Sequence, residues 1–511
     1  MKKKIVKVLA LLLAVLMALS GCSSGPSEQT MVDSKTEVGE IAQSPEEKTV
    51  LRVATISTDN VAFRELIGHI QSWALKFKFK HKNVNIVFES LSATERLRTE
   101  LMAGKGPDVL LLPTQGYWEP LNGEHSVGVT LIRDVNQAMR NGIFYDITEF
   151  YDADEELNKD SFVPAVMEAG VVDGKRYVLP LRYNMLAAYV DLEMFAETGL
   201  STDIFEKDII GFWNALTEHG DGLTASSALI RSGGHSELNL IGDLIDYDKQ
   251  EVLLTKEELV TYLKAQQDFL VTRGLNPVSL QSLLHNYYPV SPQANPYGEP
   301  ATWMGTDNCM YVGLLAYAIH NAVIAEAEGI ELGMFPLRST DGSVTADITF
   351  FGAVSGGCKN PELAYEFLRY FLTEESQWEQ NVTSTSINDS CFMAAGWPVL
   401  VKGSADAMYK RLKRWTYPIA LKDRPDATAA DIEPYTEDDI PILNVTIDKA
   451  RFPTGLESKF RDIVAFNPFT AEREAGKTLT REEMAEWAKL INIERMAEDF
   501  IEDLEWHVGE G

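Results

Sequence analysis

The stretch that most constrains the fold is VVDGKRYVLPLRYN, residues 171–184. Asp173-Gly174 is a pair that favours a two-residue hairpin turn, because both central residues of a type I′ turn need φ > 0. We predict flanking strands at 171–172 and 177–179, with Pro180 ending the ladder because it has no N–H to donate. An apolar run follows at 185–190. Since α/β sequence lies on both sides, we interpret the stretch as a crossing between two lobes.

The N-terminus predicts export and anchoring. Four lysines precede an apolar run from Val8 to Leu19. This run is shorter than the roughly 20 residues of a transmembrane helix, so residues 1–21 are interpreted as a secretory signal. Leu19-Ser20-Gly21-Cys22 resembles a bacterial lipoprotein cleavage box, which implies lipid on Cys22. The alternative is an ordinary signal peptide with an incidental cysteine. Residues 22–48 are polar and are predicted to form a disordered tether.

Charge and cysteine content exclude several classes of protein. Lys+Arg is 46 and Asp+Glu is 76, a net charge of −30, and loss of the four signal lysines brings it to −34. Such acidity argues against nucleic-acid binding, which demands a basic surface. The spacing of Cys309, Cys358 and Cys391 matches no zinc pattern, and we expect small buried residues, with one disulfide left open.

Hydrophobic periodicity predicts alternating strands and helices. Strands are expected at 50–56, 84–88 and 109–112, and an amphipathic helix is expected at 63–77. A second helix should end at Gly104, giving the β-α-β-α-β series of a doubly wound lobe. Thr255-x-x-Glu258 is typical of a capping box, and Asn360-Pro361 of a helix start. From about Phe392 onward we expect mostly helix.

Three segments carry a family resemblance. They are the crossing at 171–184, Ala-Gly-Lys-Gly-Pro-Asp at 103–108 after a helix, and Lys-Asn-Pro-Glu-Leu-Ala at 359–364 with Glu-Glu-Ser-Gln at 374–377. Together they resemble the maltose-binding-protein-like extracellular solute-binding proteins of family 1, the receptors of ATP-binding-cassette (ABC) importers. The resemblance runs from about Val50 to Leu504.

The resemblance implies an α/β, two-lobe periplasmic-binding-protein fold of type II-like topology. Each lobe is expected to be a doubly wound, mostly parallel sheet flanked by helices, with a hinge between the lobes. The expected division is 1–21 signal peptide, 22–48 tether, 49–182 with 352–384 as lobe one, and 185–350 with 390–511 as lobe two. It further implies a monomer on the extracellular face of the membrane, held by its lipid alone and docking on the transmembrane subunits of a permease.

The candidate site follows from strand ends, where open α/β sheets bind ligands. Aromatic rings cover the apolar faces of sugars, and planar polar groups bond their hydroxyl edges. We therefore expect a carbohydrate of mono- to trisaccharide size. Many family members carry a Pro-Trp pair after the glycine that corresponds to Gly305. In this chain Thr306 and Asp307 follow Gly305, which argues against a long maltodextrin as the ligand. The predicted ligand-binding residues are Ser57, Asp59, Asn60, Gln115, Tyr117, Trp118, Arg182, Tyr183, Asn184, His235, Trp303 and Asp307.

Alternatives to a sugar receptor are a receptor for a peptide or polyamine, a cell-surface glycosidase, and a sensor subunit. No motif of a metalloprotease, nucleotide-binding loop or serine hydrolase supports an enzyme. Gly104 and Gly106 end a helix instead of opening one, so Lys105 is not expected to bind phosphate. Asp246 to Glu257 imitates an EF-hand loop, but Glu251 stands where the turn needs glycine. We expect no cofactor, metal or catalytic residue.

Overall fold

The computed structural model describes residues 48–56, 64–91, 94–114, 120–121, 124–125, 130–219, 236–273, 309–315, 318, 321–322, 325, 329–377, 396–400, 440–457, 459–460, 483, 486 and 489–509. Residues 48–511 form one compact unit with two hydrophobic cores. The predicted signal peptide and tether lie outside the described residues.

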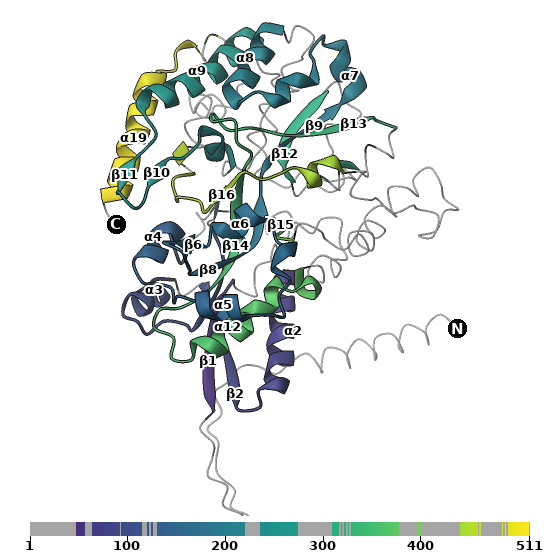
Figure 1. The fold of residues 1–511 in the computed structure, drawn as a ribbon. Coiled ribbons are helices and arrows are strands. Elements are labelled where there is room, and N and C mark those ends of the chain that lie inside the picture. The colour runs from purple at the N-terminus through teal and green to yellow at the C-terminus, as the bar shows by residue number, and fades with distance from the viewer. Residues whose placement is uncertain are drawn as a thin grey trace, which may run out of the picture. The chain divides into compact units, whose positions relative to one another are not determined.

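A mixed sheet forms the centre of the first core (Figure 1). Its strand order is β15-β8-β14-β3-β1-β2, and β16 pairs with β14. β1 runs parallel to both β2 and β3 with helices between them, which confirms the predicted β-α-β-α-β series. The elements are β1 Thr49–Thr55, α2 Arg64–Lys80, β2 Val84–Ser90, α3 Thr94–Met102, β3 Val109–Pro113, β8 Val178–Asn184, β14 Thr345–Val354, β15 Trp397–Pro398 and β16 Lys449–Arg451.

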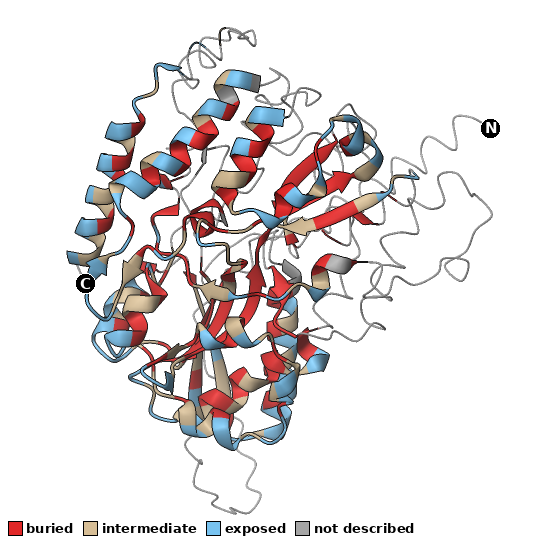
Figure 2. Cartoon of the chain, turned by 45° about the horizontal axis from the view of Figure 1, so that its top comes forward, coloured by how far each residue is buried: buried red, intermediate tan, exposed pale blue. Residues whose placement is uncertain are grey.

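Helices α2 and α12 (Pro361–Arg369) pack together through aromatic side chains. Trp73 stacks on Tyr370 with ring centroids 3.8 Å apart and planes 7° from parallel, and its Nε1–H donates to Phe367 O at 3.0 Å. α2 turns Ile70, Ala74 and Phe77 to the core at helical spacing. Figure 2 shows the same division on other helices, with buried inner faces and exposed outer faces.

The predicted turn is present, but the second strand of its hairpin is 175–176 and not 177–179, and the prediction for Pro180 is wrong. Asp173 (φ 52°) and Gly174 (φ 72°) link β6 (Val171–Val172) to β7 (Lys175–Arg176), as a type I′ turn requires. Pro180 does not end a ladder, because it lies inside β8 opposite Phe351. The register shifts at that point, and β15 pairs only with Arg182 and Tyr183. Proline is tolerated at position 180 because no described strand pairs with it on the edge of β8 that faces away from β14.

A second sheet has the strand order β12-β9-β13, with β9 Leu186–Asp191, β12 Met310–Leu314 and β13 Leu332–Pro336. β9 alternates its faces: Leu186, Ala188 and Val190 belong to the second core, and Ala187 and Tyr189 to the first. The α/β class is confirmed, but these strands run antiparallel, not parallel as expected for this lobe. β12 and β13 each return alongside β9, so no crossover helix is needed between paired strands.

Helices and short elements complete the second core: α7 Leu192–Glu197, η4 Thr202–Glu206, α8 Ile209–His219, η5 Ser236–Ile241, β10 Ile245–Asp246, β11 Glu251–Val252, α9 Lys256–Arg273 and α19 Ile493–Gly509. The predicted capping box opens α9: Thr255 Oγ1 accepts from Glu258 N at 3.2 Å, and Glu258 Oε2 accepts from Thr255 N at 2.9 Å. α19 seals this core with Phe500, which is fully buried against Phe460.

The remaining elements are β4 Pro120–Leu121, β5 Glu124–His125, α4 Val135–Arg140, α5 Thr148–Ala153, η3 Lys159–Ser161, α6 Pro164–Glu168, η8 Tyr370–Leu372 and η10 Pro441–Asn444. Gly104 (φ 63°) follows the end of α3, as predicted for a helix C-cap. Asn360 stands at the N-cap of α12 with Pro361 after it, but its side chain makes no capping hydrogen bond.

The two cores are assembled from segments far apart in the chain. β14 is one continuous strand of the first sheet across residues 350–352, where the sequence analysis divided the lobes. Trp397, Ile440 and Phe452 also join the first core, although they lie in the range assigned to lobe two. The exact division into lobes stays a prediction.

Candidate functional site

The carboxyl ends of three strands meet at one edge of the first sheet. β1 is parallel to β3, and β8 and β3 are both antiparallel to β14, so all three run in one direction. Thr55 ends β1, Thr114 follows β3, and Asn184 ends β8. Thr114 Oγ1 donates to Ile348 O on β14 at 2.6 Å, which fixes the start of the loop after β3.

Arg182 is a buried cation on β8, with only 2% of its surface exposed. Its two terminal nitrogens donate to Gln377, to Oε1 at 3.3 Å and to the carbonyl O at 3.1 Å. Gln377 Nε2 donates to Phe371 O at 2.5 Å, and Gln377 Oε1 accepts from Val399 N at 3.2 Å. Gln377 thus connects Arg182 on β8 by hydrogen bonds to the segments that contain Phe371 and Val399.

Burial controls the ionisation of this region. It lowers the pKa of Arg182 to about 9 and raises the pKa of the Tyr183 phenol well above its ordinary value. Burial, and then the positive charge of Arg182, lowers the pKa of His69 to about 4. His69 is therefore neutral at pH 7, and its Nε2 lies 3.0 Å from Ser376 Oγ.

Four polar side chains gather where the chain passes from the first sheet to the second. Asp347 on β14 lies in register with both Asn184 on β8 and Arg451 on β16. Arg451 Nε donates to Asn239 Oδ1 on η5, and its Nη1 donates to Gly242 O at 3.1 Å. We call Asn184, Asn239, Asp347 and Arg451 the crossing cluster.

The crossing cluster joins the two cores through planar polar groups. Asn184 and Asp347 lie on strands of the first sheet, whereas Asn239 lies between two residues of the second core, Leu238 and Leu240. All but Arg451 are at most 2% exposed. The Asn239 amide nitrogen is buried without a hydrogen-bond partner among the described residues, so it is an unsatisfied donor.

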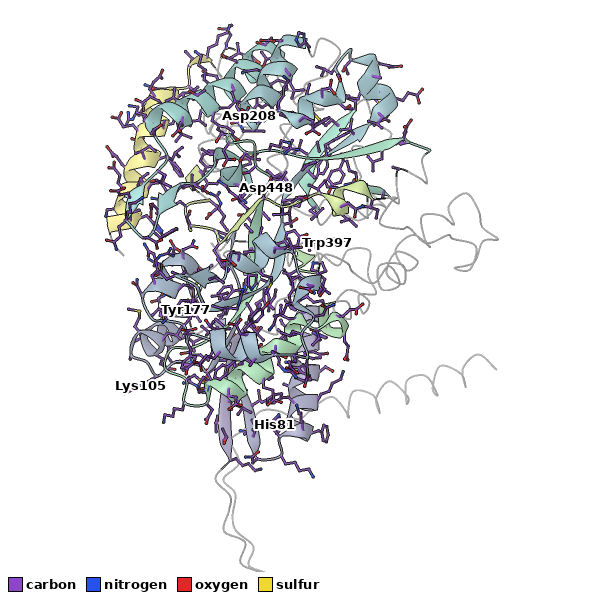
Figure 3. The ribbon with its side chains drawn as sticks, viewed as in Figure 1. His81, Lys105, Tyr177, Asp208, Trp397 and Asp448 are labelled. Carbon is purple, nitrogen blue, oxygen red and sulfur yellow. The ribbon has the colours of Figure 1, made fainter. Side chains whose placement is uncertain are left out.

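Three of the predicted ligand-binding residues are described, namely Arg182, Tyr183 and Asn184, and all lie at this edge (β8 and β15 in Figure 1; Trp397, labelled in Figure 3, pairs with Tyr183). Their role in binding stays a prediction. The others lie outside the described residues: Ser57, Asp59, Asn60, Gln115, Tyr117, Trp118, His235, Trp303 and Asp307.

Some of these residues are adjacent in sequence to described ones. Ile56 and Thr114 lead into 57–60 and 115–118 from the edge that holds Asn184, and η5 directly follows His235. β12 does not begin at the crossing. Its first residue, Met310, pairs with Val190, and its last residue, Leu314, pairs with Leu186 at the start of β9. The chain after Trp303 and Asp307 therefore enters the second sheet at the end away from the crossing.

Sequence reasoning missed Asp347, Arg451 and Gln377. Asp347 stands between two buried apolar residues of β14, and a charge in an apolar strand is a signal of a buried polar role. Gln377 ends the Glu-Glu-Ser-Gln segment, which had been noted for its resemblance alone. Arg451 has no local signal, since its importance comes from pairing with a strand about 100 residues earlier.

The described part of the chain was also compared with the patterns of metal ligands, thiols and membrane-spanning helices. It contains no group of three or more His, Cys, Asp or Glu side chains placed to hold a metal. In the EF-hand-like segment, Asp246 Oδ1 instead accepts from the backbone N–H groups of Asp248 and Lys249. Cys309 is buried, burial raises the pKa of Cys358 to about 12, and Cys391 is not described. The described helices are too short or too polar to cross a membrane.

Solved structures similar to this chain include an extracellular solute-binding protein of family 1 from Alicyclobacillus acidocaldarius (14% identity, 93% of this chain and all of that chain, TM-score 0.47). Another is an ABC substrate-binding protein from Listeria monocytogenes in complex with cycloalternan (13% identity, 89% of this chain and 99% of that chain, TM-score 0.45). A third is a periplasmic oligogalacturonide-binding protein from Yersinia enterocolitica (13% identity, 89% of this chain and all of that chain, TM-score 0.47). A search of curated proteins finds no match.

A family model decides the assignment. The model described as "bacterial extracellular solute-binding protein" matches residues 72–386, more than half of the 511 residues. The match begins within α2 and covers β2, β3, β8 and β14 of the first sheet, the crossing at β8 and β9, the second sheet and α12. The chain therefore belongs to the bacterial extracellular solute-binding protein family, the non-catalytic receptors that bind a solute and deliver it to an ABC importer.

Proposed function

We propose that this receptor binds a small carbohydrate, of mono- to trisaccharide size, at the crossing between its two cores. The observation that carries the proposal is the convergence there of buried, planar polar side chains from both cores. A solute that touches both cores only when they close on it would drive a hinge motion through differential affinity. The predicted permease subunits would then recognise the closed form.

The chemistry of the crossing suits a polyhydroxylated solute. Amide, carboxylate and guanidinium groups form pairs of hydrogen bonds with neighbouring hydroxyls, and the unsatisfied Asn239 donor supplies one such bond. Trp118, predicted to follow β3, would add a ring for the apolar face of a sugar. A polyamine would instead need clustered carboxylates, and Asp347 is the only carboxylate in the crossing cluster.

A thermal-shift screen of the chain against sugars, peptides and polyamines tests the solute class. A ligand that binds only the native state raises the melting temperature by mass action, and at 100 times its Kd it adds about 2.7 kcal/mol. We expect shifts with one or more mono- to trisaccharides. Shifts confined to peptides or polyamines would reject the carbohydrate.

Calorimetry with the selected sugar tests the site itself. Trp118→Ala should weaken binding about 5- to 150-fold, since losing a ring over a sugar face costs about 1–3 kcal/mol. Asp59→Ala should cost a similar amount by leaving hydroxyls unpaired. The exposed Trp506 on α19 provides the matched control, and Trp506→Ala should leave affinity unchanged. If Trp118→Ala lowers the melting temperature sharply and spares affinity, Trp118 belongs to a core and the site is misplaced.

A further inference from the structure

One face of α2 exposes apolar and basic side chains that no described element covers. Leu75, Lys78 and Phe79 are spaced i, i+3 and i+4, so they share one side of the helix, and the exposed Lys82 follows in the turn after the helix. Phe79 is 82% exposed and Leu75 is 63% exposed. We call these four residues the α2 stripe.

Two aligned apolar side chains with lysines beside them differ from scattered surface apolar residues, which are common. Packing against the first core does not need the α2 stripe, because Ile70, Ala74 and Phe77 already pack into that core from another side of α2. Aromatic and aliphatic groups interleaved with lysines are the signature of helices that lie in a lipid interface.

The local charge is opposite to that of the whole chain. Residues 76–82 hold four lysines and no acidic residue, in a protein with a net charge of −30. Lys76 is paired with Glu375 at 3.2 Å, and Lys80 with Glu366 at 2.6 Å. Lys78 and Lys82 are exposed and make no ion pair with any residue that the structure describes. Their charges remain available to an anionic surface.

The position of the α2 stripe is set by where the chain enters the compact unit. Thr49 N, at the start of β1, donates to Asn83 O at 2.9 Å, so the entry at Lys48 lies beside the end of α2. His81, labelled in Figure 3, marks this end of the first core. Twenty-five residues separate Lys48 from Cys22, and as a flexible chain they would span about 25–30 Å. The anchor would therefore hold this end near the lipid.

We propose that the α2 stripe docks on the anionic lipid surface to which the chain is tethered, with Phe79 and Leu75 entering the headgroup region and Lys78 and Lys82 facing lipid phosphates. The proposal rests on the predicted anchor at Cys22. A lysine near an anionic surface strengthens binding about fivefold, and this effect acts within a Debye length of about 8 Å. The tether raises the effective concentration, so a weak contact suffices.

Lysine acylation footprinting tests the docking surface. The chain from Cys22 to Gly511, with Cys358→Ser and Cys391→Ser, is coupled through the Cys22 thiol to a maleimide lipid in vesicles. These are phosphatidylcholine alone or equal parts phosphatidylcholine and phosphatidylglycerol. Lys78 and Lys82 should acylate about fivefold more slowly on the anionic vesicles than on the neutral ones. The exposed Lys207 and Lys264 of the second core should keep their rates.

Variants and salt sharpen the test. Phe79→Ser should reduce the protection of Lys78 and Lys82 without changing the melting temperature, while Trp506→Ser, the matched exposed aromatic, should have no effect. Salt near 1 M, where the Debye length is about 3 Å, should remove the protection.

Three results would overturn the proposal. The first is equal acylation rates of Lys78 and Lys82 on both kinds of vesicle, and the second is equal slowing at Lys207 and Lys264. The third is slow acylation of Lys78 and Lys82 without any vesicles that becomes fast when the chain is shortened to residues 48–511. The last would show that residues 23–47 cover the α2 stripe. Because the lipid is attached chemically, none of these results bears on lipidation in the cell or on solute binding.

Discussion

At the scale of single residues, His69 should make stability depend on pH. Its pKa falls from 6.5 to about 4 on folding, because burial and the positive charge of Arg182 disfavour its charged form. The unfolded chain therefore binds the proton first as pH falls, and stability is lost between about pH 6.5 and pH 4. When the pH is lowered from 7 to 5, the free energy of unfolding of the native protein should fall by about 2 kcal/mol more than that of His69→Gln.

Urea unfolding of both proteins at the two pH values measures this difference. Trp506→Ala, an exposed substitution that adds or removes no titratable group, serves as the control and should keep the loss seen in the native protein. Equal losses in the native protein and in His69→Gln would mean that His69 titrates normally in the folded state.

Residues with a local signal were predictable, and residues that act through distant pairing were not. The turn at Asp173-Gly174 and the cap at Thr255 depend on neighbours within a few positions, so sequence sufficed for both. Asp347 and Arg451 acquire their role from the register of β14 with β16, which lies about 100 residues away. Pro180 was misjudged for the same reason, since its strand tolerates it only because β15 is so short.

At the scale of elements, α19 should be essential to the second core. Phe500 is fully buried and lies 5.3 Å, centroid to centroid, from Phe460. Phe500→Ala should lower the free energy of unfolding by about 3–5 kcal/mol, through lost transfer energy and the cavity left behind. Trp506→Ala, on the exposed face of the same helix, should stay within about 0.5 kcal/mol of the native protein.

Chemical denaturation of both variants measures these changes in the free energy of unfolding. A signal from residues of the first core, followed in the same experiment, shows whether the two cores unfold together. If Phe500→Ala and Trp506→Ala are equally stable, α19 is not part of the packed core. The periodic pattern of a helix predicted α2 well, and Asn360-Pro361 predicted the start of α12, because both signals are local. The antiparallel order of β12, β9 and β13 was missed, because long connections of unpatterned sequence hide which strands pair.

At the scale of the whole molecule, anchoring at Cys22 remains to be tested. Cys22→Ser should move the protein from the membrane fraction to the soluble fraction, because the lipid on Cys22 is the link to the membrane that the sequence predicts. Mass spectrometry of the native protein should show acyl chains on the first mature residue. A Cys22→Ser variant that stays in the membrane, together with a native protein that lacks acyl mass, would refute the anchor. Ser23→Ala is the control and should leave the distribution unchanged.

The sheet of the first core also bears on how the chain leaves the cell. β14 lies between β3 and β8, and Phe452 is buried in the same core, so this core is complete only after about 450 residues have been made. Pairings over such long sequence separations close slowly, since loop entropy is lost before contacts form. The first sheet of a nascent chain of this kind cannot be completed while most of the chain is still being synthesised. An exported polypeptide that folds late remains thin enough to be threaded through a secretion channel before its tertiary structure closes.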